Sequence, residues 1–115
     1  MSTTVKLNPG DYLLHEGEVS NEMYYLQTGT LAVFKKKGDK DQQIGTIISG
    51  ELVGEMSFLD KHPRSASVKA MTESTLVVIP QEMLESTLGS LPKWFTALQL
   101  TLLDRLRKAN ARIKI

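Results

Sequence analysis

The 115-residue sequence contains no cysteine, only two histidines and no long hydrophobic run. Without cysteine there can be no disulfide, thiolate zinc site or cysteine nucleophile. The apolar stretches, such as residues 76–80, are far shorter than the roughly 18 residues that a membrane-spanning helix needs. The N-terminus, Met-Ser-Thr-Thr-Val-Lys, lacks the apolar core of a signal peptide, so we expect a cytoplasmic protein.

The formal net charge is only +1, but the charges are distributed unevenly along the chain. Residues 1–92 carry 8 Lys/Arg against 12 Asp/Glu, a net charge of −4, whereas residues 93–115 carry 6 against 1, a net charge of +5. The length fits one domain, and 41% hydrophobic residues are typical of a globular protein. We therefore expect a single domain over residues 1–115 that ends in a basic segment.

Residues 1–80 alternate short apolar segments with turn residues, which is the pattern of β-strands. Residues 23–26 and 31–34 are separated by a segment that contains Gly29, and this spacing predicts a hairpin. Residues 35–41 are wholly polar and predict a second turn. Many short strands with frequent turns favour an antiparallel sandwich or barrel over βαβ units. We therefore interpret residues 1–80 as an antiparallel β-roll.

After Pro80 the sequence predicts helices. Residues 81–88 contain no Gly or Pro and predict a short helix that ends at Gly89. Pro92 suits the first turn of a longer helix that reaches toward the C-terminus. Apolar residues recur along this helix at steps of three and four: Leu98, Leu102, Leu106, Ala109 and Ile113. The apolar stripe either packs onto the β-roll or pairs with a second copy, and a homodimer through this helix is our first expectation.

Residues 54–68 carry the most informative chemistry. A short helix entered through Gly54 would present free backbone N–H groups to an anion. Arg64 could supply a bidentate guanidinium to the same anion, and Glu55 could accept a hydrogen bond from a ligand hydroxyl. These residue types together predict a site for a nucleotide or a sugar phosphate.

This segment resembles the phosphate-binding cassette of the cyclic-nucleotide-binding domain family, whose members include effector domains of the catabolite activator protein and of protein kinase A regulatory subunits. The family pattern runs Gly-Glu, apolar, small, two apolar residues, a short gap, then Arg, small and Ala. The matching residues here are Gly54-Glu55-Met56-Ser57-Phe58-Leu59 and Arg64-Ser65-Ala66. The resemblance covers essentially the whole chain. It implies a double-stranded jelly roll over 1–80, with a short cassette helix within 54–66 and two C-terminal helices over 81–115.

The resemblance also implies how a cyclic nucleotide would be held. Glu55 would accept the ribose 2′-hydroxyl. Arg64 would pair with the cyclic phosphate, helped by Ser65 and by backbone amides around Gly54, Met56 and Ser57. We expect cAMP, with cGMP as the other possibility, because Ser65 stands where cGMP-binding members often have Thr.

The resemblance implies two kinds of contact with the purine, one apolar and one polar. Ile44 and Ile47 are the candidates for apolar contact with the base. Asn110, on the long helix of a second copy, could hydrogen-bond the adenine edge, whereas Ala109 cannot donate such a bond. No metal or other cofactor is expected.

The resemblance and the residues leave alternatives for the output. No DNA-binding, kinase or channel segment follows the long helix in this sequence, so the expected output is an unidentified signalling partner or a changed homodimer. The chain could equally be the N-terminal part of a longer regulator. Ser57, Asp60 and His62 crowd within six positions and form no hydrolytic motif, so no enzyme is expected. The alternative function is a ligand-free β-roll adaptor that binds a protein partner.

Overall fold

The computed structural model describes residues 3–55 and 63–112 of the chain, with side chains described up to residue 109. The chain divides into two compact units, Met1–Pro80 and Gln81–Ile115. The expected cassette helix falls largely on residues 56–62, which lie outside the described residues. The expectation of one domain over residues 1–115 stays a prediction.

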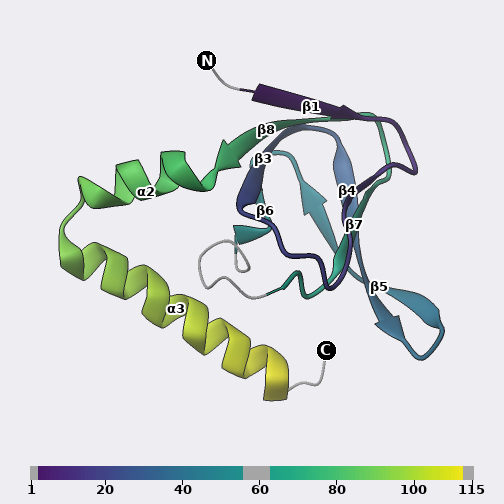
Figure 1. Ribbon diagram of the computed structural model, residues 1–115. Helices are drawn as coiled ribbons and strands as arrows, with labels where there is room; N and C mark the ends of the chain where they lie inside the picture. Colours follow the sequence, from purple (N-terminus) through teal and green to yellow (C-terminus); the bar gives the residue numbers. More distant parts are fainter. Residues whose placement is uncertain (1–2, 56–62, 113–115) are drawn as a thin grey trace. The chain divides into compact units, whose positions relative to one another are not determined.

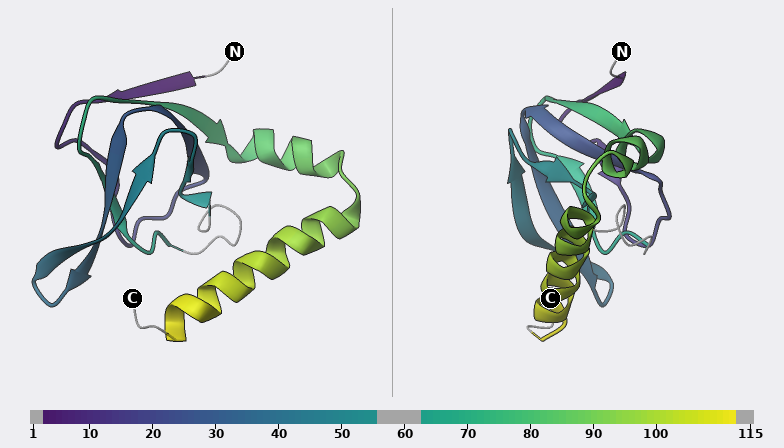
Figure 2. Two further views of the ribbon diagram at one scale, coloured as in Figure 1. Left: turned by 180° about the vertical axis from the view of Figure 1, so that it is seen from behind. Right: turned by 90° about the vertical axis from the view of Figure 1, so that its left-hand side faces the viewer.

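The described part of the first unit contains two antiparallel sheets of four strands each, which enclose a common interior (Figures 1 and 2). One sheet has the order β1-β8-β3-β6, with β1 at Thr3–Leu7, β8 at Ser74–Pro80, β3 at Glu22–Thr28 and β6 at Leu52–Val53. The other has the order β2-β7-β4-β5, with β2 at Tyr12–Leu14, β7 at Ser67–Ala70, β4 at Thr30–Lys37 and β5 at Lys40–Ile48. This arrangement confirms the mainly antiparallel β fold expected from the sequence.

The core of the β-roll is formed by alternate residues of the strands. Side chains two residues apart in a strand point to the same face of the sheet. On β3, Tyr24 and Leu26 point into the core, and they pair in register with Val78 and Leu76 of β8. Tyr25 lies between them on the opposite face and is exposed. The alternation of apolar residues in the sequence therefore sets which face of each strand is buried.

The hairpin between β4 and β5 differs from the sequence prediction. Residues 35–41 were expected to form one polar turn, but β4 continues through Lys37 and β5 resumes at Lys40. Only Gly38 and Asp39 are left in the turn, and Gly38 has a φ of 69°. The prediction was wrong in extent because backbone hydrogen bonds, rather than apolar side chains, hold this part of the hairpin together. The β4–β5 hairpin projects from the roll as a ribbon (Figure 1).

The turn between β3 and β4 requires glycine at position 29. Gly29 has a φ of 104°, which side chains other than glycine rarely tolerate. A Cβ atom at this position would lie 2.2 Å from the Ser74 Oγ atom and 2.6 Å from the Glu73 carbonyl oxygen. The hairpin predicted between residues 23–26 and 31–34 is wrong, because β3 pairs with β6 and β8, β4 pairs with β5 and β7, and the chain crosses from one sheet to the other at Gly29. The close approach of the neighbouring turn explains the glycine.

The second unit consists of two helices, α2 at Gln81–Gly89 and α3 at Lys93–Arg112, in the part of the chain that the structure describes. Both helices confirm the elements predicted after Pro80. The Ser90 hydroxyl donates a hydrogen bond of 2.7 Å to the Thr87 carbonyl at the end of α2. Pro92 precedes α3 and accepts a bond of 3.0 Å from the Phe95 amide. Among the described helices, none combines the length and apolar character that crossing a membrane requires.

Candidate functional site

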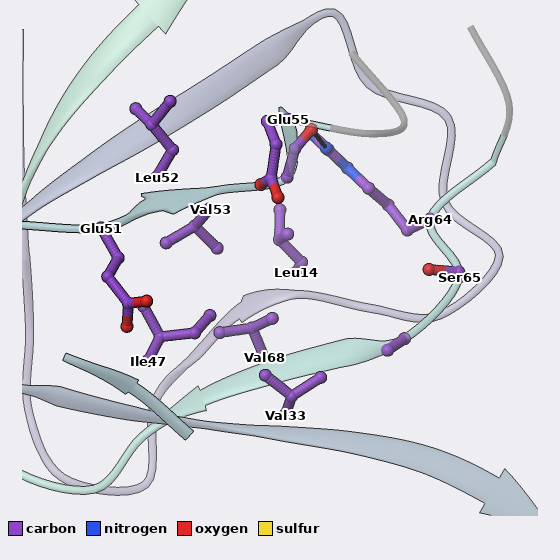
Figure 3. A pocket seen from close by; sticks show the side chains of 12 residues that line it. Leu14, Val33, Ile47, Glu51, Leu52, Val53, Glu55, Arg64, Ser65 and Val68 are labelled. Carbon is purple, nitrogen blue, oxygen red and sulfur yellow. Dashed lines mark hydrogen bonds between the residues drawn. The ribbon is translucent and has the colours of Figure 1, made fainter. Parts of the chain in front are cut away.

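A pocket of about 300 Å³ opens in the β-roll beside the end of β6 (Figure 3). This volume lies at the lower end of the range of roughly 300–1,000 Å³ found for small-molecule sites. The lining residues come from β2, from β4 to β6, and from the segment that enters β7: Leu14, Val33, Ile47, Glu51, Leu52, Val53, Gly54, Glu55, Arg64, Ser65, Ala66 and Val68.

The pocket combines an apolar wall with a small polar group. Leu14, Val33 and Val68 stand on neighbouring strands of one sheet and line the pocket; Val33 and Val68 lie together, and Leu14 lies closer to Glu55 (Figure 3). Glu55 and Arg64 lie together at another edge, where β6 ends and the segment before β7 begins. Such an arrangement suits a ligand with an apolar body and a few polar or charged groups.

Arg64 is the buried charge of the pocket, with only 3% of its surface exposed. Its Nη1 atom donates a hydrogen bond of 2.8 Å to the Gly54 carbonyl, and its Nη2 atom donates one of 2.5 Å to the Glu22 carbonyl. The Arg64 main chain pairs with the preceding loop: its amide donates to the Glu18 carbonyl and its carbonyl accepts from the Gly17 amide, both at 2.8 Å. Backbone and side chain therefore both fix the position of Arg64.

The electrostatic environment of Arg64 is unusual for a guanidinium. Burial lowers the pKa of Arg64 because the charged form loses its hydration. Tyr24 and the carboxylates of Glu18, Glu22 and Glu55 act in the opposite direction and favour the charged form. Both side-chain acceptors described for Arg64 are neutral carbonyls.

One donor of Arg64 has no partner in the part of the chain that the structure describes. The Nε atom is buried and makes no hydrogen bond to the described residues. Among residues 3–55 and 63–109, no carboxylate lies within 4.0 Å of the guanidinium as an ion-pair partner. Leaving a buried donor unsatisfied is costly, and a buried charge is normally compensated by an opposite charge. An anionic ligand that reached Arg64 would compensate its charge and could accept a hydrogen bond from this donor.

Gly54 is required by the packing of Arg64. Its φ is 78°, and a Cβ atom here would lie 2.4 Å from Nη1 and 3.2 Å from Cζ of Arg64. Any larger residue at position 54 would displace the guanidinium. The sequence assigned Gly54 to ligand binding alone, whereas the structure shows that it also makes room for Arg64.

The structure brings together five of the residues expected at the site and leaves four elsewhere or undescribed. Gly54, Glu55, Arg64, Ser65 and Ile47 all line the pocket. The others are placed differently: Ile44 is 41% exposed on β5 and is not among the lining residues, Met56 and Ser57 lie outside the described residues, and the Asn110 side chain is likewise not described.

Two sets of contacts could not be predicted from the sequence. The apolar wall residues Leu14, Val33, Val53 and Val68 could have been found only as members of core faces, because strand alternation does not show which core side chains border a cavity. The bond from Arg64 to the carbonyl of Glu22 has no sequence signal at all, because every residue carries a carbonyl.

Comparison with known proteins agrees with this geometry. The family model of the cyclic nucleotide-binding domain matches residues 4–90 of the chain. The chain therefore belongs to the cyclic nucleotide-binding domain family, as the cassette residues indicated.

Relatives with this domain are much longer than the chain. The potassium/sodium hyperpolarization-activated cyclic nucleotide-gated channel 4 of Homo sapiens is 31% identical over 107 residues, which are 93% of this chain and 9% of the channel. The cAMP-dependent protein kinase regulatory subunit of Hypocrea atroviridis is 31% identical over 86 residues, 75% of this chain and 18% of that protein. The chain thus spans less than a fifth of each of these two relatives.

Solved structures share the fold. The crystal structure of the Thermus thermophilus catabolite activator protein superimposes with a TM-score of 0.80 and is 26% identical, covering 98% of this chain and 54% of that one. The match extends over the β-roll and the C-terminal helices, since it covers nearly the whole sequence.

Proposed function

We propose that the chain is a regulatory domain that binds a cyclic nucleotide, cAMP in the first instance, in the pocket between Glu55 and Arg64. Arg64 binds the cyclic phosphate through its free Nε donor, and Ser65 adds a hydroxyl to the same group. Glu55 accepts the ribose hydroxyl, and the base lies against the apolar wall near Ile47. Membership of the family identifies the kind of domain. The proposal goes further, because it names the ligand and the residues that bind it.

The single observation that carries this proposal is a buried arginine in the pocket wall whose Nε donor has no hydrogen-bond partner among the described residues. A cyclic phosphate carries one negative charge and several acceptor oxygens. It would satisfy the donor and compensate the buried charge at once. A carboxylate placed beside it favours a ligand that also carries hydroxyl donors, as the ribose of a nucleotide does.

The output of the domain forms the second part of the proposal. Leu98, Leu102 and Leu106 are exposed on α3, and an exposed apolar stripe is commonly an interface. We propose a homodimer through α3, in which Asn110 of one copy reaches the base held by the other, and an unidentified signalling protein as the further partner.

The rival function is a ligand-free adaptor. One observation favours it: both Nη atoms of Arg64 already hold carbonyls, of Gly54 and Glu22, and so tie β6 to the start of β3. In that case Arg64 serves only the fold, and the pocket has no ligand.

Calorimetric titration of the nucleotide-stripped protein separates the two functions. The ligands are cAMP, cGMP, linear AMP and adenosine, and the variants are Arg64→Lys and Glu55→Gln. Lysine keeps the charge but loses the fork of donors, so we expect Arg64→Lys to weaken cAMP binding by at least about tenfold. Arg105→Lys, an exposed position on α3, is the matched control and should bind as the unaltered protein does.

Thermal unfolding gives an independent readout of the same binding. A ligand at 100 times its dissociation constant should stabilise the protein by about 2.7 kcal/mol. Binding of a cyclic nucleotide but not of AMP, lost in Arg64→Lys, supports the regulatory domain. No heat and no shift of the melting temperature with any of the ligands would leave the adaptor as the function.

A further inference from the structure

A buried cluster next to the pocket contains a carboxylate that could compete with the ligand for Arg64. Glu22 and Tyr24 are two residues apart on β3, so their side chains point to the same face of the sheet. The Glu22 carbonyl already accepts a bond from Nη2 of Arg64. Its side-chain carboxylate is near enough to Arg64 to favour the charged form of the guanidinium.

The Glu22 carboxylate is held by a different donor. The hydroxyl of Tyr24 donates a hydrogen bond of 3.3 Å to its Oε1 atom. Tyr24 itself is buried in the core of the roll, which fixes the place of its hydroxyl.

A second carboxylate near Arg64 is engaged in the same way. Oε1 of Glu18 accepts a hydrogen bond of 2.6 Å from the His15 amide and so closes the turn before β3. Both acids therefore have donors other than Arg64, and neither of them accepts a hydrogen bond from its Nε. The two donors differ in how cleanly they can be removed. The backbone amide of His15 is lost only by substitution with proline, which also restricts the main chain, whereas phenylalanine removes the hydroxyl of Tyr24 and leaves the ring.

We propose that Tyr24 is a positioning residue for the ligand: its hydroxyl holds the Glu22 carboxylate away from Arg64 and so keeps the guanidinium available to an anion. The inference rests on the proposed function. An ion pair between an arginine and a carboxylate is stronger than a bond to a neutral carbonyl, particularly where water is excluded. Without the hydroxyl, the carboxylate turns to Arg64, and an incoming phosphate must displace it.

A set of four variants tests the inference by titration with cAMP. Tyr24→Phe removes only the hydroxyl, and we expect it to weaken binding about tenfold, the scale of one charge-assisted hydrogen bond. Tyr25→Phe is the matched control, since Tyr25 is the next residue on the opposite, exposed face, and its affinity should not change. Glu22→Gln should retain the affinity, and Tyr24→Phe with Glu22→Gln should restore it.

The double variant decides between positioning and a merely structural role. If Tyr24→Phe acts by loosening the core, adding Glu22→Gln leaves the weak binding as it is, and the inference is overturned. If it acts by releasing the carboxylate, the amide of glutamine no longer competes and the affinity returns. Circular dichroism and melting curves of each variant show whether the fold is retained.

A measurement without ligand keeps the inference separate from the proposed function. The Nε–H resonance of Arg64, assigned by its loss in Arg64→Lys, should move in Tyr24→Phe and return in the double variant, because an ion pair forms and is then removed. The same resonance should stay in place in Tyr25→Phe. If the unaltered protein binds no nucleotide but this pattern is seen, the proposed function fails and the arrangement of Tyr24 and Glu22 stands. If the resonance does not move in Tyr24→Phe, the inference fails whatever the protein binds.

Discussion

The β-roll and the long helix use the same residue type in opposite ways. Leu26, Leu31 and Leu76 in the roll are fully buried, whereas Leu98, Leu102 and Leu106 on α3 are 46%, 50% and 57% exposed. The leucines of the roll stabilise the structure that holds the pocket. Those of α3 form an apolar surface of the kind that usually binds another molecule. The comparison separates the part of the chain that we propose to bind a ligand from the part that we propose to transmit the signal.

The largest expected effect is the loss of folding stability when a buried leucine is replaced by alanine. Leu76→Ala should lower the free energy of unfolding by about 2–5 kcal/mol, because it leaves a cavity in a closed core. Leu102→Ala removes the same atoms from a half-exposed site and should cost no more than about 0.5 kcal/mol in dilute monomer. Urea unfolding of both variants measures the difference. Equal losses would show that the stripe of α3 is part of the stabilising core.

The next largest effect is also on folding stability, and it differs between alanine substitutions at two glycines of the roll. Gly29→Ala should cost about 2–4 kcal/mol, because it adds backbone strain at positive φ to a clash with the turn at Ser74. Gly10 has a φ of 92° but nothing within 4 Å of a Cβ atom. Gly10→Ala should therefore cost only the strain, about 1–2 kcal/mol. The melting temperatures of the two variants provide the comparison, and a ranking in the reverse order would contradict the packing described for the β3–β4 turn.

The smallest effect is that of the buried Tyr24 on folding stability at high pH. Burial, with a further contribution from Glu22, raises the pKa of Tyr24 above its usual value of 10.0. Below that value the tyrosine is neutral in both states; above it the unfolded chain loses the proton first, so stability falls as the pH rises toward the folded pKa. From about pH 10 upward, where the phenol of an unfolded chain loses its proton, Tyr24→Phe should lessen this decline. Unfolding midpoints of Tyr24→Phe and of the unaltered protein across this range are the measurement, and an identical decline in the two would place the titration elsewhere.

Several parts of the structure could be predicted because the sequence marks them locally. Gly29 marks the turn between β3 and β4, although these strands lie in different sheets rather than in the predicted hairpin, and Gly89 and Pro92 bracket the break between the helices. The alternation of apolar residues on β3 and β8 gives the core face, since each strand has one buried side. These features depend on neighbouring residues, which is why one sequence suffices.

Other parts could not be predicted because they depend on distant segments. Arg64 was expected to face a phosphate, but its bonds to the carbonyls of Gly54 and Glu22 follow only from the folded arrangement. Ile44 was expected beside the base. It falls where the β4–β5 pairing skips from Gly45 to Gln43, and such an irregularity changes where a side chain points.

The central claim is that Arg64 binds the phosphate of a cyclic nucleotide through its unpartnered Nε atom. A crystal structure of the nucleotide-stripped protein with saturating cAMP tests it most directly. The account predicts phosphate oxygens within hydrogen-bond distance of Arg64 Nε and of the Ser65 hydroxyl, with the ribose hydroxyl on Glu55. Nucleotide bound away from Arg64, or a pocket that stays empty while Arg64 keeps only its two carbonyl partners, would contradict it.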